Sequence, residues 1–248
     1  MHHVEIGADI VARVLERRGR LHLFDALDAR RTAFVVIDMQ NAFCEPGAPV
    51  EVPAARGIVP AINRLAGELR RLGGTVVWVR AVVDDRAGMD NWGSYLNVVL
   101  GDAAKLDAFI DYIGSGGRGT ELWRELDIGA DDLKIAKSRY SALAPGTSDL
   151  LRALRLRRLD NLLIGGTKTN VCCESTARDA HELDFNVAMV SDCLATLSER
   201  EHLATLETFI QQFGDVVTHD EAIAALYNHA NRAGSDREQP GPIQGRDA

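Results

Sequence analysis

The stretch NLLIGGTKTNVCCESTARDAHELDFNVAMVSD, residues 161–192, decides the fold class. It opens with the apolar run NLLIGG (161–166), continues through the helix-forming segment VCCESTARDAHEL (171–183), and ends in a second apolar run, NVAMVSD (186–192). Short, near-continuous apolar runs are typical of strands buried on both faces of a parallel sheet. Strand, helix and strand in this order predict two parallel strands joined by a crossover helix.

The same alternation extends along most of the chain in both directions. We expect further strands at 33–38, 75–83, 132–137 and 215–218, and helices at 58–72, 148–159, 199–213 and 219–228. The pattern predicts an α/β protein, built as a three-layer, doubly wound, mostly parallel sheet of about six strands. Residues 84–128 are less regular, and we interpret them as a functional insertion with one or two helices.

The pattern divides the chain into three parts. Residues 1–31 form an N-terminal helical extension, whose helix at 8–18 packs on the main domain or on a second subunit. Residues 32–227 form the main domain, and residues 228–248 form a polar C-terminal tail without apolar periodicity. Such a tail is either disordered or an arm exchanged with a partner. Both ends have the character of interface material, so we expect a homo-oligomer, either a dimer or a tetramer.

Composition narrows the class of partner. The net charge of −8 and the pI of about 5.4 disfavour non-specific binding to nucleic acid or to anionic membranes. The first twenty residues are too charged for a signal peptide, and no apolar run approaches the roughly 18 residues that cross a membrane. Four cysteines without an export signal indicate reduced thiols. We therefore expect a cytoplasmic protein that acts on a small molecule.

Two ionisable residues stand at the predicted ends of buried strands. Asp38 follows the apolar run AFVVI, and Lys137 follows LKIA, in which Ile135 and Ala136 have the character of buried positions. A buried charge is costly unless it is paired or hydrogen-bonded. Each residue alone has a plain alternative, such as capping the next turn. However, the carboxyl ends of parallel strands meet at one sheet edge, where ligands bind, so we expect the pair to lie there together.

The adjacent thiols Cys172 and Cys173 lie at the predicted start of a helix. A thiol in the first helical turn meets unpaired backbone N–H groups and the positive end of the helix dipole, and both lower its pKa. A nearby lysine lowers that pKa further. An aspartate in reach could take the thiol proton, and the N–H groups could hold an oxyanion, which would complete an acyl-transfer site. The alternative is that both thiols only fill the core.

Three segments of the chain resemble the isochorismatase-like cysteine hydrolases. This group includes nicotinamidase, N-carbamoylsarcosine amidase, biuret hydrolase and ureidoacrylate amidohydrolase. The segments, in the order of the family, are AFVVIDMQNAF (33–43), KIAKSRYSAL (134–143) and LLIGGTKTNVCCESTARDAHELDFNVAMVSD (162–192). The resemblance covers most of residues 32–225 and implies the isochorismatase-like hydrolase fold for the domain at 32–227.

The resemblance implies an Asp–Lys–Cys triad, and the matching positions are Asp38, Lys137 and Cys172. The family pattern, T-x-x-C-V-x-x-T-A-x-D-A, is filled from residue 169 to residue 180, with Cys173 where Val is usual. Because neighbours on a helix are turned about 100° apart, the two thiols cannot face one pocket. We therefore expect Cys173 to point into apolar packing and to be inert.

The resemblance also implies how an oxyanion would be held. The family carries a cis peptide bond that corresponds here to Thr167–Lys168. This bond would direct the Lys168 backbone N–H toward the oxyanion, with the Cys172 backbone N–H as the second donor.

This chain departs from the family in two places that concern the substrate. Leu143 stands where Phe is commoner and would reshape one pocket wall. The zinc-binding branch, nicotinamidase, places an Asp and two His after the second strand, but this sequence has no histidine between His22 and His181. We therefore expect no metal and no cofactor.

Six residues near these segments are candidate substrate contacts, and each has a structural alternative. Trp92 and Tyr95 lie in the insertion, where the family builds its substrate lid, but they also suit ordinary packing. Arg80 suits a substrate carboxylate or an ion pair with Asp84, and loop asparagines often only stabilise a turn. The set is Asn41, Arg80, Trp92, Tyr95, Arg139 and Tyr140.

The sequence thus predicts a metal-independent cysteine hydrolase that cleaves a C–N bond of a small amide or ureido compound through a thioester. Two alternatives stay open. One is a vinyl-ether hydrolase of the isochorismatase type, although isochorismatases proper often lack the nucleophilic cysteine. The other is a catalytically silent binding or scaffold domain of the same fold, which the intact Asp38, Lys137 and Cys172 disfavour.

Overall fold

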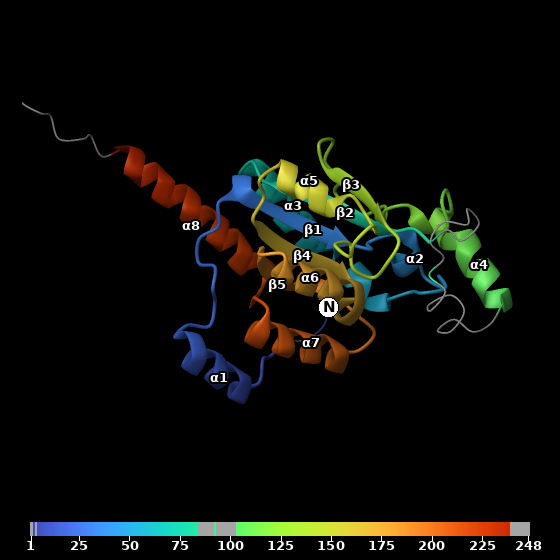
Figure 1. Cartoon of the computed structure of the whole chain (residues 1–248), viewed down its shortest axis with the longest axis horizontal. Helices are drawn as coiled ribbons and strands as arrows, with labels where there is room; N and C mark the ends of the chain where they lie inside the picture. The colour runs from blue at the N-terminus through green and yellow to red at the C-terminus, as the bar shows by residue number, and fades with distance from the viewer. Residues whose placement is uncertain (1, 3, 84–91, 93–102, 239–248) are drawn as a thin grey trace, which may run out of the picture.

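The central feature of the molecule is a six-stranded sheet with helices on both faces (Figure 1). The computed structural model describes residues 2, 4–83, 92 and 103–238 of the chain. The strand order is β3-β2-β1-β4-β5-β6, and every adjacent pair is parallel. The predicted doubly wound α/β architecture is therefore confirmed. The strands are β1 (Thr32–Ile37), β2 (Thr75–Ala81), β3 (Leu133–Lys137), β4 (Asn161–Thr167), β5 (Asn186–Ala195) and β6 (Asp215–Val217).

Alternate residues of β1 show how the sequence builds two layers of helix. Phe34 and Val36 join one hydrophobic cluster with α3, α4 and α8, whereas Val35 and Ile37 join the other with α5, α6 and α7. Successive strand residues point to opposite faces, so the fully apolar β1 serves both clusters at once. The long helices are α1 (Ala8–Arg18), α3 (Val59–Arg71), α4 (Ala103–Ile113), α5 (Leu150–Leu156), α6 (Glu174–Glu182), α7 (Glu199–Gln212) and α8 (His219–Glu238).

Short helical segments complete the chain between these elements. They are η1 (Ala29–Arg31), α2 (Asn41–Cys44), η2 (Pro53–Ile58), η4 (Arg118–Thr120) and η5 (Thr169–Cys173). None of the helices in the described ranges is both long enough and apolar enough to cross a membrane.

The N-terminal extension packs on its own domain. Helix α1 lies along α7 (Figure 1), and its residues Ile10 and Val14 join the cluster on that face of the sheet. Arg17 Nη1 donates a hydrogen bond of 2.8 Å to the backbone carbonyl of Gln211. Of the two placements that the sequence left open for this helix, the structure shows the one on the main domain.

The structure corrects three details of the sequence interpretation. Ala136 is exposed, not buried, because β3 is an edge strand that pairs only with β2. The predicted helix at 171–183 begins with the π-helical turn η5, and α6 starts only at Glu174. The helix predicted at 219–228 is longer than expected, because α8 continues to Glu238 through polar residues that tolerate a helix although they form no apolar stripe.

At Gly166 the backbone of β4 lies so close to the backbone of β1 that no side chain fits between them. Its φ of +111° lies outside the range that L side chains adopt readily, and an added Cβ would lie 2.0 Å from the Ile37 carbonyl oxygen. We expect Gly166→Ala to lower the free energy of unfolding by about 3 kcal/mol or more, as measured by urea denaturation. Gly67→Ala is the control, because nothing lies within 4 Å of that position on α3, and it should be neutral or stabilising. Equal stability of the two variants would contradict the packing argument.

Candidate active site

Three chain segments meet at the carboxyl edge of the sheet. Asp38 directly follows β1, Lys137 is the last residue of β3, and Cys172 lies in η5, just after β4. The strand order reverses between β1 and β4, which is the point where doubly wound sheets leave room for a ligand. Asp38 adopts a φ of 56°, a left-handed conformation that ends the strand and turns the chain at this edge.

Asp38 and Lys137 form a buried ion pair. Lys137 Nζ lies 2.9 Å from Asp38 Oδ2, and the two side chains are 1% and 0% exposed. Lys137 Nζ also donates a hydrogen bond of 3.0 Å to the Arg139 backbone carbonyl. The charge of the lysine stabilises the carboxylate. Such a charge pair is stable in a low-dielectric site only while both partners are present.

The same neighbours and the same burial set the pKa values of the site. Burial raises the pKa of Asp38, and the charge of Lys137 offsets part of this effect. For Lys137, burial acts to lower the pKa, but the negative charge of Asp38, joined by that of Cys172 once its thiol is ionised, prevails and raises it. The ammonium is therefore charged at every pH at which the protein works.

The pKa of Cys172 differs from the sequence-based expectation. Burial, followed by the negative charge of Asp38, raises it to about 12, although Lys137 acts in the opposite direction. The predicted lowering of this pKa is therefore wrong for the ligand-free protein. A helix end and a lysine do not compensate for complete burial next to a carboxylate. The Cys172 thiol is therefore neutral at pH 7, whereas Lys137 is an ammonium.

The two adjacent thiols have different surroundings. Cys172 lines a cavity, whereas Cys173 is fully buried in the cluster shared with α6 and α7. The Cys173 thiol donates a weak 3.8 Å hydrogen bond to the Gly165 carbonyl, and burial raises its pKa well above the ordinary value. The structure thus separates one thiol that faces the cavity from one that faces the core. The other two cysteines, Cys44 and Cys193, are buried and free.

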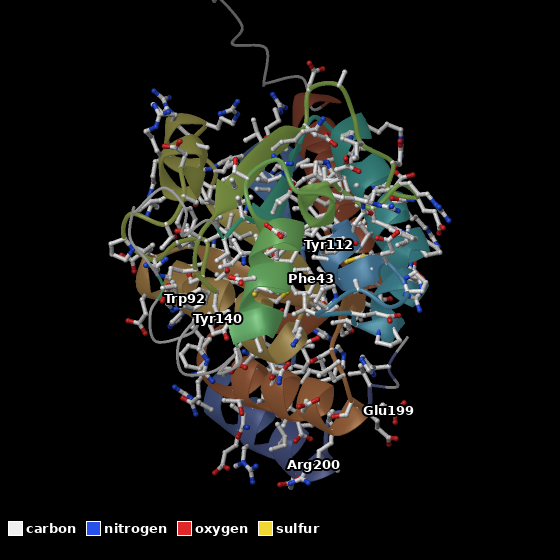
Figure 2. All side chains as sticks on the ribbon, turned by 90° about the vertical axis from the view of Figure 1, so that its right-hand side faces the viewer. Phe43, Trp92, Tyr112, Tyr140, Glu199 and Arg200 are labelled. Atoms are coloured by element: carbon white, nitrogen blue, oxygen red, sulfur yellow. The ribbon has the colours of Figure 1, made fainter. Side chains whose placement is uncertain are left out.

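The cavity beside Cys172 has a volume of about 40 Å³ and walls that are mainly apolar. Trp92 and Tyr140 lie next to each other (Figure 2). Their rings meet edge to face with centres 4.5 Å apart, and the Arg139 guanidinium lies 5.4 Å from the Trp92 ring centre. Three of the predicted substrate contacts, Trp92, Arg139 and Tyr140, therefore lie in the wall of this cavity. The lining consists of Phe43, Ala81, Val83, Trp92, Phe109, Ile113, Lys137, Ser138, Arg139, Tyr140 and Cys172.

Two of the other predicted contacts, Asn41 and Arg80, are not among the described residues that line this cavity. The Asn41 amide donates to the Arg118 carbonyl at 3.1 Å, and Arg80 Nη1 donates to the Thr120 carbonyl at 3.2 Å. Both side chains therefore hold the segment around η4 against the strand ends. Arg80 precedes the cavity residue Ala81, and successive strand residues face opposite sides of the sheet. Tyr95 and Asp84 lie outside the described residues.

Sequence reasoning missed the apolar walls of the cavity. Phe43 comes from α2, and Phe109 and Ile113 come from α4. Phe109 and Ile113 are four residues apart, which places them on one helix face. That spacing was the available signal, but only the fold places this face against Cys172.

The turn between β4 and η5 has the backbone geometry that the resemblance implies. The Thr167–Lys168 peptide bond is cis. Within the described chain, no oxygen accepts a hydrogen bond from the Lys168 backbone N–H. No group of three or more His, Cys, Asp or Glu side chains in the described ranges is placed to hold a metal ion.

A larger cavity lies away from this edge of the sheet. It measures about 450 Å³ and is bounded by α1, α7 and the segment before β5, with Arg17, Arg18 and Phe213 in its wall. Its size does not make it the active site, because its lining contains neither a nucleophile nor a buried base. The smaller cavity has the Lys137 ammonium and the Cys172 thiol in its wall, and the buried Asp38 carboxyl group lies 2.9 Å from that ammonium.

Comparisons with known proteins place this site in a family. The family model described as "Isochorismatase domain" matches residues 32–221. Ureidoacrylate amidohydrolase RutB of Variovorax paradoxus is 32% identical over 216 residues, covering 81% of this chain and 83% of that protein. A probable inactive nicotinamidase of Arabidopsis thaliana is 34% identical over 183 residues, covering 71% of this chain and 87% of the relative.

A solved structure shows the same fold. The cysteine hydrolase from Pseudomonas syringae pv. phaseolicola superimposes with a TM-score of 0.75 at 27% identity, and the match covers 85% of this chain and 98% of that one. The family model covers most of the chain and includes Asp38, Lys137 and Cys172. This chain therefore belongs to the isochorismatase family of hydrolases.

Proposed function

We propose that the protein is a cysteine amidohydrolase that cleaves a C–N bond of a small amide or ureido compound through a thioester. The observation that carries this proposal is the arrangement of three buried groups at one edge of the sheet. Lys137 and Cys172 line the cavity, Asp38 forms an ion pair with Lys137, and both charges act on the pKa of the Cys172 thiol after burial has raised it. The amidohydrolase relative at 32% identity supports the same class of reaction.

In the first step, the Asp38 carboxylate accepts the proton of the Cys172 thiol. The net charge of the site is the same before and after this transfer, because Lys137 stays protonated. A transfer of this kind avoids the cost of adding a charge to a buried site. The thiolate then attacks the carbonyl carbon, and the Lys168 and Cys172 backbone N–H groups donate to the oxygen as it becomes negative.

In the second step, the tetrahedral intermediate collapses and the C–N bond breaks. Asp38 returns its proton to the departing nitrogen, which leaves as ammonia or an amine. A water molecule then gives a proton to Asp38 and attacks the thioester. Expulsion of Cys172 and its reprotonation by Asp38 yield the carboxylic or carbamic acid and restore the resting site.

The cavity wall supports a small and partly planar substrate. Trp92 and Tyr140 provide aromatic surface, and the Arg139 guanidinium lies over the Trp92 ring. Vinyl-ether hydrolysis is the second candidate reaction, and it uses no cysteine nucleophile. A catalytically silent domain is the third, and the probable inactive relative makes it a real alternative.

Measuring ammonia release across a panel of carboxamides and ureido acids tests the proposal. The wild-type enzyme should release ammonia from at least one compound, and the Cys172→Ala variant should give the blank rate. Activity on isochorismate with no ammonia from any amide would favour the vinyl-ether reaction. Inactivity on both substrate classes, together with a Cys172 that iodoacetamide does not label, would favour the silent domain.

The pH dependence of kcat/KM tests the role of Asp38. The base must be ionised, and burial raises the pKa of Asp38 above its ordinary value of 3.8. Activity should therefore fall as the pH decreases through this raised pKa, which is a higher pH than an exposed aspartate would give. On the alkaline side, the thiol pKa of about 12 predicts no loss caused by thiol ionisation up to pH 10. An acid limb centred below pH 3.8 would contradict the assignment of Asp38 as the base.

We also infer that the protein is a homo-oligomer. The C-terminal half of α8 runs away from the sheet (Figure 1), as expected of a helix that meets another subunit. Light scattering coupled to size exclusion would give the mass of the assembly. A particle of 27.0 kDa, the mass of one chain, would contradict this inference.

A further inference from the structure

A buried histidine contacts the turn that carries Lys168 and Cys172, and the proposed mechanism does not use it. His202 lies in the first turns of α7 and is 0% exposed. Its Nδ1 atom lies 2.8 Å from the Thr169 hydroxyl oxygen, which is also fully buried. Thr169 follows Lys168 directly and begins η5, the turn that ends at Cys173. The contact therefore joins α7 to the back of the proposed oxyanion site.

The imidazole of His202 is neutral at physiological pH. Burial, followed by the neighbouring His2, lowers its pKa to about 4, while the backbone carbonyl of Ser191 acts in the opposite direction. A neutral imidazole has one N–H donor and one acceptor nitrogen. The ring therefore has two polar neighbours, the Thr169 hydroxyl at Nδ1 and the backbone carbonyl of Ser191.

Neighbouring contacts hold the same turn on the side away from the cavity. The Thr196 hydroxyl donates to Asn170 Oδ1 at 2.6 Å, and His2 Nε2 lies 3.0 Å from the Thr196 carbonyl oxygen. The His2 and His202 rings lie 4.8 Å apart. Two successive residues after Lys168 are thus fixed, one by His202 and one by Thr196. Because the side chains of Thr169 and Asn170 are both held, the backbone of this turn has little freedom to rotate.

We propose that His202 is a positioning residue, which fixes the Thr169 hydroxyl and thereby the direction of the Lys168 backbone N–H toward the reacting carbonyl oxygen. This inference rests on the proposed function, because it requires an oxyanion formed by attack of Cys172. It assigns a role in transition-state stabilisation to a residue that touches neither substrate nor nucleophile. Removing the contact should therefore lower the rate of acylation more than it lowers substrate binding or thiol reactivity.

Two matched substitutions at position 202 separate hydrogen bonding from packing. In His202→Asn, the side-chain amide reaches the place of Nδ1 and can keep the bond to Thr169. In His202→Gln, the amide reaches the place of Nε2 and loses that bond. At the other partner, Thr169→Val removes the hydroxyl at nearly constant shape, and Thr169→Ser keeps it.

The probe reactions are acylation by p-nitrophenyl acetate and alkylation by iodoacetamide. In acylation, Cys172 Sγ bonds to the acetyl carbon and p-nitrophenolate leaves, so an oxyanion forms on the way. In alkylation, Sγ displaces iodide from a CH₂ group, and no oxyanion forms. We expect His202→Gln and Thr169→Val to lower the acylation rate about ten- to thirtyfold. The rate of alkylation by iodoacetamide, and the KM for p-nitrophenyl acetate, should each change less than about threefold.

The possible results distinguish a failure of the proposal for His202 from a failure of the proposed function. The Asn and Ser variants should recover most of the acylation rate, and Thr169→Val should have little further effect in the His202→Gln background. Equal losses in acylation and alkylation, or equal losses in the Asn and Gln variants, would reduce His202 to a packing residue. If wild-type Cys172 is alkylated but never acylated, the proposed function itself fails.

Discussion

Cys172→Ala is expected to abolish turnover, with a fall in kcat of about four orders of magnitude or more. This loss follows because the thiol is the proposed nucleophile that forms the covalent intermediate, and removal of a nucleophile has effects of this size. Asp38, Lys137 and the backbone N–H groups remain, but they have no nucleophile to activate. The measurement is ammonia release under saturating substrate, with intact-protein mass spectrometry to detect the acyl-enzyme.

Cys173→Ala is the matched control, because it removes the same atom from the adjacent residue. Cys173 is buried in apolar packing and bonds only weakly to the Gly165 carbonyl. We expect this variant to keep most of its activity and to lose about 1 kcal/mol of stability. Comparable losses of activity in the two variants would contradict the assignment of Cys172 as the nucleophile.

Lys137→Met is expected to have the second largest effect, on stability as well as on activity. The substitution leaves the Asp38 carboxylate buried without its counter-charge, and removing one partner of a buried ion pair costs about 3–5 kcal/mol. Part of this cost disappears if Asp38 takes up a proton, but a protonated Asp38 cannot accept the thiol proton. Urea denaturation at pH 7 and the kcat of the folded variant therefore both report on the loss of the positive charge beside Asp38.

The double variant Asp38→Asn with Lys137→Met separates the two effects. Both charges are absent, so the free energy of unfolding should recover to within about 1–2 kcal/mol of the wild type. Activity should stay as low as in either single variant, because the base is missing. A double variant as unstable as Lys137→Met alone would show that packing, not charge pairing, governs stability at this site.

Much of the fold could be predicted from apolar runs and their spacing. The run AFVVI before Asp38 indicated a strand buried on both faces, and β1 is completely buried between β2 and β4. The polar residues that follow such runs were therefore expected at one sheet edge, where Asp38 and Lys137 do lie 2.9 Å apart. Edge positions were less predictable, because pairing partners decide whether a residue such as Ala136 is covered.

The candidate site was predictable in its residues but not in its electrostatics. The pattern from residue 169 to residue 180 distinguished Cys172 from Cys173, and only Cys172 lines the cavity. The sequence suggested a lowered thiol pKa because a helix end and a lysine are local features. Burial depends on segments that are distant in the chain, and it raises that pKa to about 12. The protonation state of the resting site is therefore a property of the fold.

The sequence by itself determined the order of strands and helices, the residues at the strand ends and the family to which the chain belongs. Only the tertiary structure decided which of those residues share a cavity. It turned Arg80 and Asn41 toward the segment around η4, brought α4 to the cavity wall, and placed His202 against Thr169 across 33 positions of sequence. The physical reason is that periodicity reports which face of an element is buried, whereas packing alone decides what lies against that face.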